Sequence, residues 1–282
     1  MSTLADNDRD GLPLRVAGEV EDVRPPSLVH AEWREAFPWL VQGTTTRGAH
    51  LEPYDLGLFS GGSPRASVQR RWAELGASSG MYRVIHARQV HGRVVRHHGR
   101  GRPPPAIQAG VEGARREPDG RIAEVELVED CDGHFSTEPG SLLAVTVADC
   151  VPIFLVDPRR RLVGVLHAGW RGAAAGILEQ GLATAVRAGA DVSDLRVHLG
   201  PAICGDCYEV GPEVFVALDR PAPEGPAPID LRVILFERTL ARGLRAEHVT
   251  VSSRCTLCSG SGLFSHRGGD RQRQAGFIGI RP

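Results

Sequence analysis

The sequence predicts a mixed α/β domain, or an α+β domain, rather than a strict βαβ series. Patterns typical of strands and of helices alternate along the 282 residues, and short pairs of consecutive strands recur between the helices. The longest apolar run, residues 142–156, is rich in Val, Ile and Leu. Such a run is typical of a strand that is covered on both faces.

The first half of the chain contains several short elements between loops. Residues 1–27 are polar and predict a flexible tail, so that residues 28–282 form the single domain. A strand ending near residue 43 leads to Arg47, a candidate anion ligand, and residues 67–75 predict a helix. A strand over residues 84–95 would place Gln89, His91 and Arg93 on one face. The Arg/Pro-rich residues 97–120 predict a surface insertion.

The second half continues the alternation. Residues 130–134, Asp-Cys-Asp-Gly-His, are rich in metal-ligand side chains, although a turn explains them equally well. Further strands are predicted over residues 122–128, 162–166, 195–199, 249–252 and 276–280, and helices over 173–187, from about 213, and over 231–243.

Composition excludes several classes of function. The 33 basic and 34 acidic side chains nearly cancel, so neither nucleic acid nor a membrane is expected as partner. The N-terminus has no apolar signal core, and no apolar stretch approaches the roughly 18 residues of a spanning helix, which predicts a cytoplasmic protein. The chain has no lysine, which excludes Schiff-base catalysis and a lysine-containing phosphate loop. Its one asparagine, Asn7, makes a Cys-His-Asn triad unexpected.

Residues 141–180 concentrate the chemically reactive groups. Asp149 and Cys150 interrupt the long apolar run, and a buried carboxylate is costly unless it is paired. His167 ends the next apolar run, and a glycine-rich turn with Arg171 precedes the predicted helix. A strand, a tight turn and a helix N-terminus favour anion binding.

Three interpretations of these groups stay open on the residues alone. The first is a catalytic zinc held by His91, Cys150 and His167, with a water in the fourth position. The second is a structural zinc held by two Cys-x-x-Cys pairs, 204/207 and 255/258, although the 47 residues between the pairs exceed the roughly 15 to 20 that are typical. The third is a cysteine hydrolase in which His167 activates Cys150. A buried thiol and a packed histidine are the structural alternative.

Several motifs resemble the polyphenol oxidase–laccase domain family, whose members are regarded as purine nucleoside phosphorylases with added adenosine deaminase activity. The motifs are Gln89-Val-His-Gly92, Ala148-Asp-Cys-Val-Pro152, His167-Ala-Gly-Trp-Arg-Gly172, Gly200-Pro-Ala-Ile203, Tyr208-Glu-Val-Gly211, Cys255-Thr256 and Phe264-Ser-His-Arg267. The resemblance extends from about residue 43 to residue 280.

The resemblance implies a four-layer α/β/β/α domain with mixed sheets, and a zinc bound by His91, Cys150 and His167. It also implies phosphorolysis of adenosine, inosine, guanosine or methylthioadenosine. The sequence leaves open whether the protein is a monomer or a homodimer. Multicopper chemistry is not expected, because this chain has only one adjacent histidine pair, His97-His98.

The resemblance also suggests roles for individual residues. Cys150, Asp149 and Arg171 are the candidate catalytic residues, with Asp149 orienting the metal site rather than binding the metal. The candidate substrate-binding residues are Arg47, Gln89, His266 and Arg267.

One departure from the family keeps other functions open. Asp55 stands where the family usually has asparagine, and an acid near a bound phosphate would be repulsive. The alternatives are a zinc or cysteine hydrolase or deaminase that does not use phosphate, and an inactive scaffold.

Overall fold

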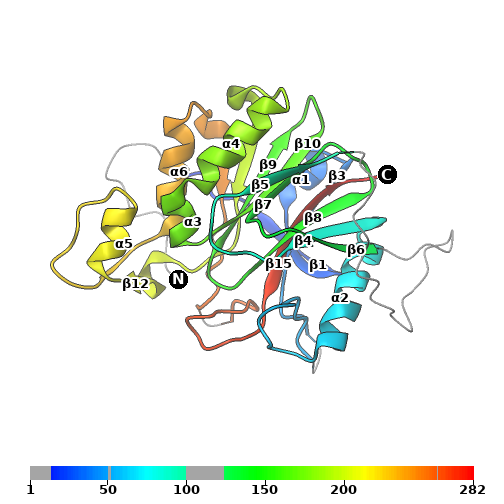
Figure 1. Ribbon diagram of the computed structural model, residues 1–282, viewed down its shortest axis with the longest axis horizontal. Helices are drawn as coiled ribbons and strands as arrows, with labels where there is room; N and C mark the ends of the chain where they lie inside the picture. Colours follow the sequence, from blue (N-terminus) through cyan, green and yellow to red (C-terminus); the bar gives the residue numbers. More distant parts are fainter. Residues whose placement is uncertain (1–13, 50–51, 100–123, 259) are drawn as a thin grey trace.

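Two mixed β-sheets stack face to face, and helices cover both outer faces (Figure 1). The computed structural model describes residues 14–49, 52–99, 124–258 and 260–282. Within these residues no helix is both long and apolar enough to cross a membrane. The mixed α/β class predicted from the sequence is confirmed.

One sheet of the described residues has seven strands in the order β1-β2-β3-β15-β8-β4-β6. They are β1 (Glu19–Val23), β2 (Pro26–His30), β3 (Leu40–Thr45), β15 (Gln274–Ile280), β8 (Ser141–Val147), β4 (Arg83–Ala87) and β6 (Glu124–Val128). The C-terminal β15 lies antiparallel between β3 and β8, whereas β4 runs parallel to both β8 and β6. Strand β15 is thus the central strand of this sheet and joins its two halves.

The other sheet of the described residues has six strands in the order β14-β11-β9-β10-β7-β5. They are β14 (Val249–Val251), β11 (Arg196–Leu199), β9 (Val151–Asp157), β10 (Leu162–Ala168), β7 (Gly133–Ser136) and β5 (Val95–His98). A small ribbon pairs β12 (Glu209–Val210) with β13 (Ala227–Pro228).

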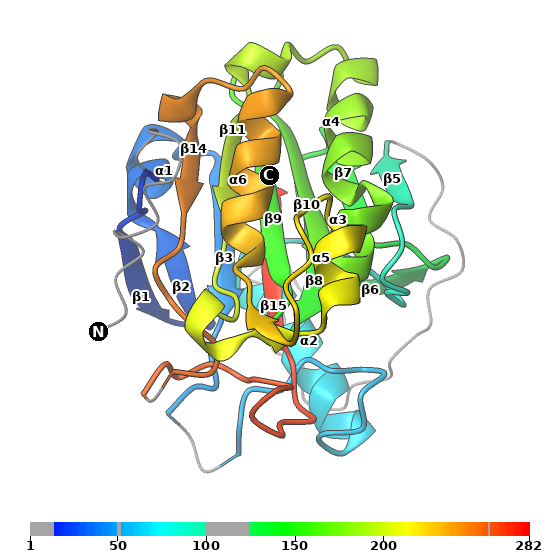
Figure 2. The same ribbon diagram turned by 90° about the vertical axis from the view of Figure 1, so that its left-hand side faces the viewer.

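Helices from the second half of the chain cover the six-stranded sheet, and Figure 2 shows α4 and α6 in front of it. This layer holds α3 (Trp170–Ala175), α4 (Ile177–Arg187), α5 (Pro212–Ala217) and α6 (Leu231–Ala241). Helix α2 (Arg65–Ser78) packs on the seven-stranded sheet through Trp72 and Leu75, and α1 (Ala31–Ala36) connects β2 to β3. Short 3-10 turns lie at Val192–Asp194, Gly205–Cys207 and Ala246–His248.

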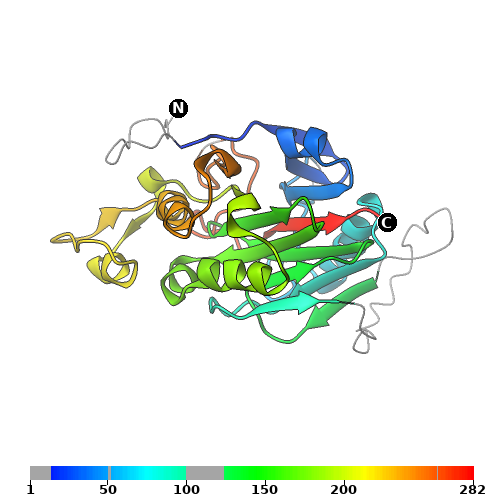
Figure 3. The same ribbon diagram turned by 90° about the horizontal axis from the view of Figure 1, so that it is seen from above.

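Strand alternation explains the layers, which Figure 3 shows from above. Along β9, Ile153 and Leu155 pack under the helices, whereas Phe154 and Val156 point into the core between the sheets. A strand buried on both faces needs apolar residues at every position, which is the pattern that the sequence has here.

The expected strand over residues 142–156 is in fact two strands, β8 and β9, in different sheets. A single strand of that length would exceed the roughly 3 to 10 residues usual in globular proteins. The chain turns at residues 148–150, where Asp149 has a φ of 87°. The interruption that suggested a site is therefore the crossing between the two sheets.

Three other expectations need correction. The strand over residues 84–95 stops at Ala87, and His91 lies in a turn with a φ of 57°, so Gln89, His91 and Arg93 do not share a strand face. The helix over residues 173–187 starts at Trp170 and breaks at Gly176, whose φ of 87° ends α3. The expected tail includes a strand, since β1 pairs with β2, while residues 1–13 lie outside the described residues.

The expected insertion also overlaps a strand, because β5 includes His97 and His98 and pairs with β7. Its remainder, from residue 100, lies outside the described residues, as do residues 121–123.

Candidate metal centre

Three side chains predicted as zinc ligands lie together at the end of the inter-sheet core. The ligand atoms of His91, Cys150 and His167 all lie within 4.8 Å of one another. Cys150 precedes β9 and His167 is near the end of β10, and the antiparallel pairing of these strands brings the two residues together. His91 reaches them from the turn after β4. His167 is buried, Cys150 is half-buried and His91 is exposed, so the cluster opens toward solvent.

Asp132 holds two of the three ligands in place and is fully buried. Its Oδ1 accepts hydrogen bonds from His167 Nδ1 and from the backbone N–H of His91, each at 2.9 Å. Its Oδ2 accepts the N–H of Gly92 at 2.8 Å. Because Nδ1 of His167 donates to Asp132, Nε2 is the nitrogen left for a metal.

Sequence reasoning did not assign this role to Asp132. The only signal was that residues 130–134 are rich in ligand-type side chains, and a turn explains them equally well. The contact with His167 depends on the pairing of β7 with β10, which sequence reasoning did not predict.

The electrostatics of the cluster favour the thiolate that a metal requires. Burial alone would raise the pKa of Cys150, but the imidazoles of His167 and His91 lower it to about 6. Burial would lower the pKa of His167, but Cys150 and Asp132 raise it to about 9. Thiolate is the form of cysteine that binds metals.

The packing around the cluster suits a bound ion. A Cβ atom on Gly169 would lie 2.9 Å from Cys150 Sγ and 3.0 Å from His91 Cδ2, so this position requires glycine. Imidazole and thiolate are ligand types that zinc accepts, and three protein ligands with an open side leave the fourth position that a catalytic zinc site keeps free. The residues present therefore fit zinc, whereas the identity of the metal stays a prediction.

Asp149 acts as a junction between loops. Its Oδ1 accepts the hydroxyl of Thr256 at 2.6 Å, and its Oδ2 accepts the N–H of Arg267 at 2.7 Å. Its carbonyl accepts the N–H of Ile203 at 3.1 Å. Asp149 thereby ties the turn that presents Cys150 to two other loops, and its role in orienting the metal site stays a prediction.

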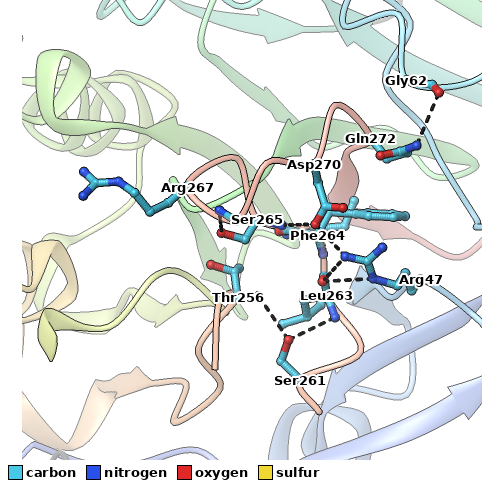
Figure 4. Close-up of polar contacts among 12 residues, drawn as sticks. Arg47, Gly62, Thr256, Ser261, Leu263, Phe264, Ser265, Arg267, Asp270 and Gln272 are labelled. Carbon is cyan, nitrogen blue, oxygen red and sulfur yellow. Dashed lines mark hydrogen bonds and ion pairs between the residues drawn. The ribbon is translucent and has the colours of Figure 1, made fainter. Parts of the chain in front are cut away.

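The two arginines expected to bind phosphate lie in different environments. The guanidinium of Arg47 donates to Asp270 and to the carbonyl of Leu263, and lies 4.5 Å over the ring of Phe264 (Figure 4). Arg171 is exposed at the start of α3 and lies 4.4 Å over the ring of Trp170. Arg47 thus organises the loop that contains Asp270, and its phosphate role stays a prediction.

The other predicted substrate residues are also only partly available. The amide of Gln89 is engaged by Thr146, donating to its carbonyl at 2.8 Å and accepting its N–H at 2.7 Å. Arg267 points away from Arg47 in Figure 4, donates to the carbonyl of Glu209 and lies 5.2 Å over the ring of Tyr208. His266 is exposed beside it. These binding roles stay predictions.

Two residues near the centre did not enter the predicted site as binding groups. Burial lowers the pKa of Arg273, whereas the acidic groups of Cys150, Asp55 and Asp149 act to raise it. Asp55 is fully buried and accepts the N–H groups of Gly57 and Arg273 through Oδ1, while its Oδ2 has no partner among the described residues. The sequence signal that pointed to this part of the structure was Asp55 itself, which stands where the family usually has asparagine.

Comparisons with known proteins show the family to which this chain belongs. A family model described as multi-copper polyphenol oxidoreductase laccase matches residues 41–281. The purine nucleoside phosphorylase YlmD of Geobacillus stearothermophilus is 41% identical over 169 residues, which are 55% of this chain and 61% of that protein. The match thus spans less than two thirds of that relative. A purine nucleoside phosphorylase of Mycobacterium bovis is 32% identical over 238 residues, covering 79% and 85% of the two chains.

A further relative and two solved structures extend the comparison. The adenosine deaminase RL5, from an unknown prokaryotic organism, is 36% identical over 151 residues, covering 50% and 58% of the two chains. The crystal structure of YlmD from Geobacillus stearothermophilus superposes with a TM-score of 0.78 at 29% identity, covering 94% and 100%. The crystal structure of YfiH from Bacillus licheniformis superposes with a TM-score of 0.74 at 26% sequence identity, covering 91% of this chain and 97% of that chain. This chain therefore belongs to the multi-copper polyphenol oxidoreductase laccase family.

Proposed function

We propose that this chain is a zinc-dependent purine nucleoside phosphorylase acting on adenosine, inosine, guanosine or methylthioadenosine, with additional adenosine deaminase activity. The observation that carries the proposal is the cluster of His91, Cys150 and His167, which is oriented by Asp132 and open on one side. The names of the relatives, purine nucleoside phosphorylase and adenosine deaminase, support the reaction class.

The protein's own groups prepare the cluster for an ion. His91, Cys150 and His167 would hold the zinc, which supplies a Lewis-acid charge beside the substrate when bound. Asp132 keeps the proton of His167 on Nδ1, because its Oδ1 lies 2.9 Å from that atom. Asp149 holds the turn before Cys150 through its bond to Thr256.

In phosphorolysis, a phosphate oxygen forms a bond to C1′ of the ribose while the bond from C1′ to the base nitrogen breaks. The base leaves with that electron pair and takes up a proton. Arg171 is suited to hold the phosphate, since it is exposed and forms no ion pair with a carboxylate in the described part of the chain. Arg273 adds positive charge near Cys150 and Asp149. Fixed positive charge around phosphate stabilises the transition state.

The test is nucleoside turnover by the zinc-loaded protein with and without phosphate. Release of free base and sugar phosphate, dependent on phosphate, is expected for the wild type and is expected to be lost in Cys150→Ala. Cys131→Ala is the matched control, because Cys131 is a buried thiol outside the cluster. Equal turnover by the wild type and Cys150→Ala would contradict the proposal.

A zinc-dependent deaminase or hydrolase that does not use phosphate is the second candidate. It is favoured by the buried carboxylate of Asp55, which lies close enough to influence Arg273 and would repel a phosphate held there. Release of ammonia from adenosine, or of free base without phosphate, would select this candidate. If the zinc-loaded protein turns over no nucleoside, the inactive scaffold would be the remaining alternative.

A further inference from the structure

Four cysteines form a second cluster, separate from the proposed catalytic centre. Cys204 and Cys207 lie in the loop after β11, and Cys255 and Cys258 in the loop after β14. The Sγ atoms all lie within 4.8 Å of one another, and Cys258 Sγ is 3.9 Å from Cys204 Sγ and 3.8 Å from Cys207 Sγ. All four are free thiols.

These distances match a tetrahedral metal site rather than a disulfide. A tetrahedron with zinc–sulfur bonds of about 2.3 Å has sulfur–sulfur edges of about 3.8 Å. The sulfurs of a disulfide are separated by only about 2.05 Å. The measured separations of 3.8 and 3.9 Å agree with the tetrahedral edge.

The fold explains how two cysteine pairs that are far apart in the sequence can bind one ion. The 47 residues between the two pairs contain α5 and α6, which form part of the outer helical layer. The strands β11 and β14 are parallel neighbours, with Leu199 opposite Val251. The loops that follow parallel strands emerge at the same edge of the sheet, so the two cysteine pairs meet there.

The backbone supports sulfur in its charged form. Cys255 Sγ accepts the N–H of Cys204 at 3.3 Å and that of Leu257 at 3.4 Å. Ala202 and Cys255 also form a β-bridge, which fixes one loop against the other. N–H donors that face a thiolate compensate its charge, as they do around other metal-bound ligands.

We propose that Cys204, Cys207, Cys255 and Cys258 bind a structural zinc ion. All four ligands come from the protein, so this site is closed, unlike the open cluster around His91. The position of this site also suggests its structural role. Ile203 and Thr256, the neighbours of Cys204 and Cys255, both form hydrogen bonds with Asp149. The structural zinc would therefore fasten both loops that hold the turn before Cys150.

The zinc content of the purified protein tests this proposal, by mass spectrometry of metals under reducing conditions. We expect about two zinc ions per chain in the wild type, one at each cluster. We expect about one in Cys150→Ala, because this substitution removes a ligand from the open cluster and leaves the four thiolate ligands of the closed site in place. We expect about one also in the double variant Cys207→Ser/Cys258→Ser. The matched control Cys131→Ala should retain about two. A wild type with about one zinc, all of it lost in Cys150→Ala, would overturn the proposal.

A second measurement does not depend on the folding of cysteine variants. In Cys150→Ala loaded with cobalt, four thiolates should produce an intense sulfur-to-cobalt charge-transfer band with tetrahedral ligand-field absorption. Absence of this band would contradict the site, as would a disulfide among the four cysteines in peptides from freshly purified, unreduced protein. Nucleoside turnover is not a readout here, so failure of this proposal is distinguishable from failure of the proposed catalytic function.

Discussion

The Oδ1 atom of Asp132 lies 2.9 Å from Nδ1 of His167, although 35 positions separate the two residues in the chain. The backbone N–H of His167 also donates to the carbonyl of Asp132 at 2.7 Å. These two contacts fix both the ring orientation and the position of the histidine. A carboxylate–histidine pair of this kind commonly orients a metal ligand.

Asp132→Asn should weaken zinc binding and turnover by about 10- to 100-fold, because the amide is neutral and cannot accept all the bonds that the carboxylate accepts. Zinc affinity measured by competition with a chelator checks this. Asp130→Asn is the matched control, since Asp130 is exposed two positions away. Unchanged zinc affinity in Asp132→Asn would show that the pair is only structural.

Gly169→Ala should reduce zinc occupancy and lower turnover by about tenfold or more. The added Cβ would lie 2.9 Å from Cys150 Sγ and 3.0 Å from His91 Cδ2, and the displacement of either ligand by a fraction of an ångström disrupts a metal site. Zinc content and kcat are the measurements. Gly225→Ala is the control, because a Cβ there meets no atom within 4 Å. Full zinc occupancy in Gly169→Ala would contradict the close packing described here.

Asp55→Asn should lower the KM for phosphate by about three- to tenfold, because it removes a negative charge near Arg273. The Oδ1 atom of asparagine can still accept the N–H groups of Gly57 and Arg273, so the fold should be retained. The measurements are KM for phosphate and the melting temperature. A higher KM with an unchanged melting temperature would instead indicate that the carboxylate takes part in the reaction.

The protein should lose stability as the pH falls below about 6.5, partly because of buried histidines outside the metal clusters. Burial lowers the pKa of His86 to about 4 and that of His30 to about 3. The unfolded chain therefore binds more protons than the native one in this range. The stability is present above the unfolded pKa and is lost as the pH falls toward the folded pKa. For His86 the loss between pH 7 and pH 5 is about 2 kcal/mol.

The variant His86→Phe isolates this contribution. It removes the titrating ring but retains an aromatic group against Trp72, which stacks on His86 at 4.8 Å. The free energy of unfolding in urea, measured at pH 7 and pH 5 with equal zinc, should change less with pH in the variant than in the wild type. An identical pH dependence in both proteins would exclude His86 as a source of the acid sensitivity.

The site was partly accessible from the sequence. His91, Cys150 and His167 each lie in a specific sequence motif, so the sequence could identify them as candidate ligands. The structure brings their ligand atoms within 4.8 Å of one another. The turn geometry at His91 was not accessible, because a left-handed φ at a histidine leaves no trace in hydrophobic periodicity. The engagement of Arg47 with Asp270 was not accessible either, since the spacing of charges does not say which charges meet.

What the sequence by itself determined was the mixed α/β class and the run of buried strands around Cys150, because apolar patterning is a local property of the chain. Only the tertiary structure decided that residues 142–156 divide between two sheets, that Asp132 holds His167, and that two distant cysteine pairs meet after β11 and β14. Each of these depends on strand pairing between segments far apart in the chain. Such pairing is governed by the packing of whole layers, and no short window of sequence contains that information.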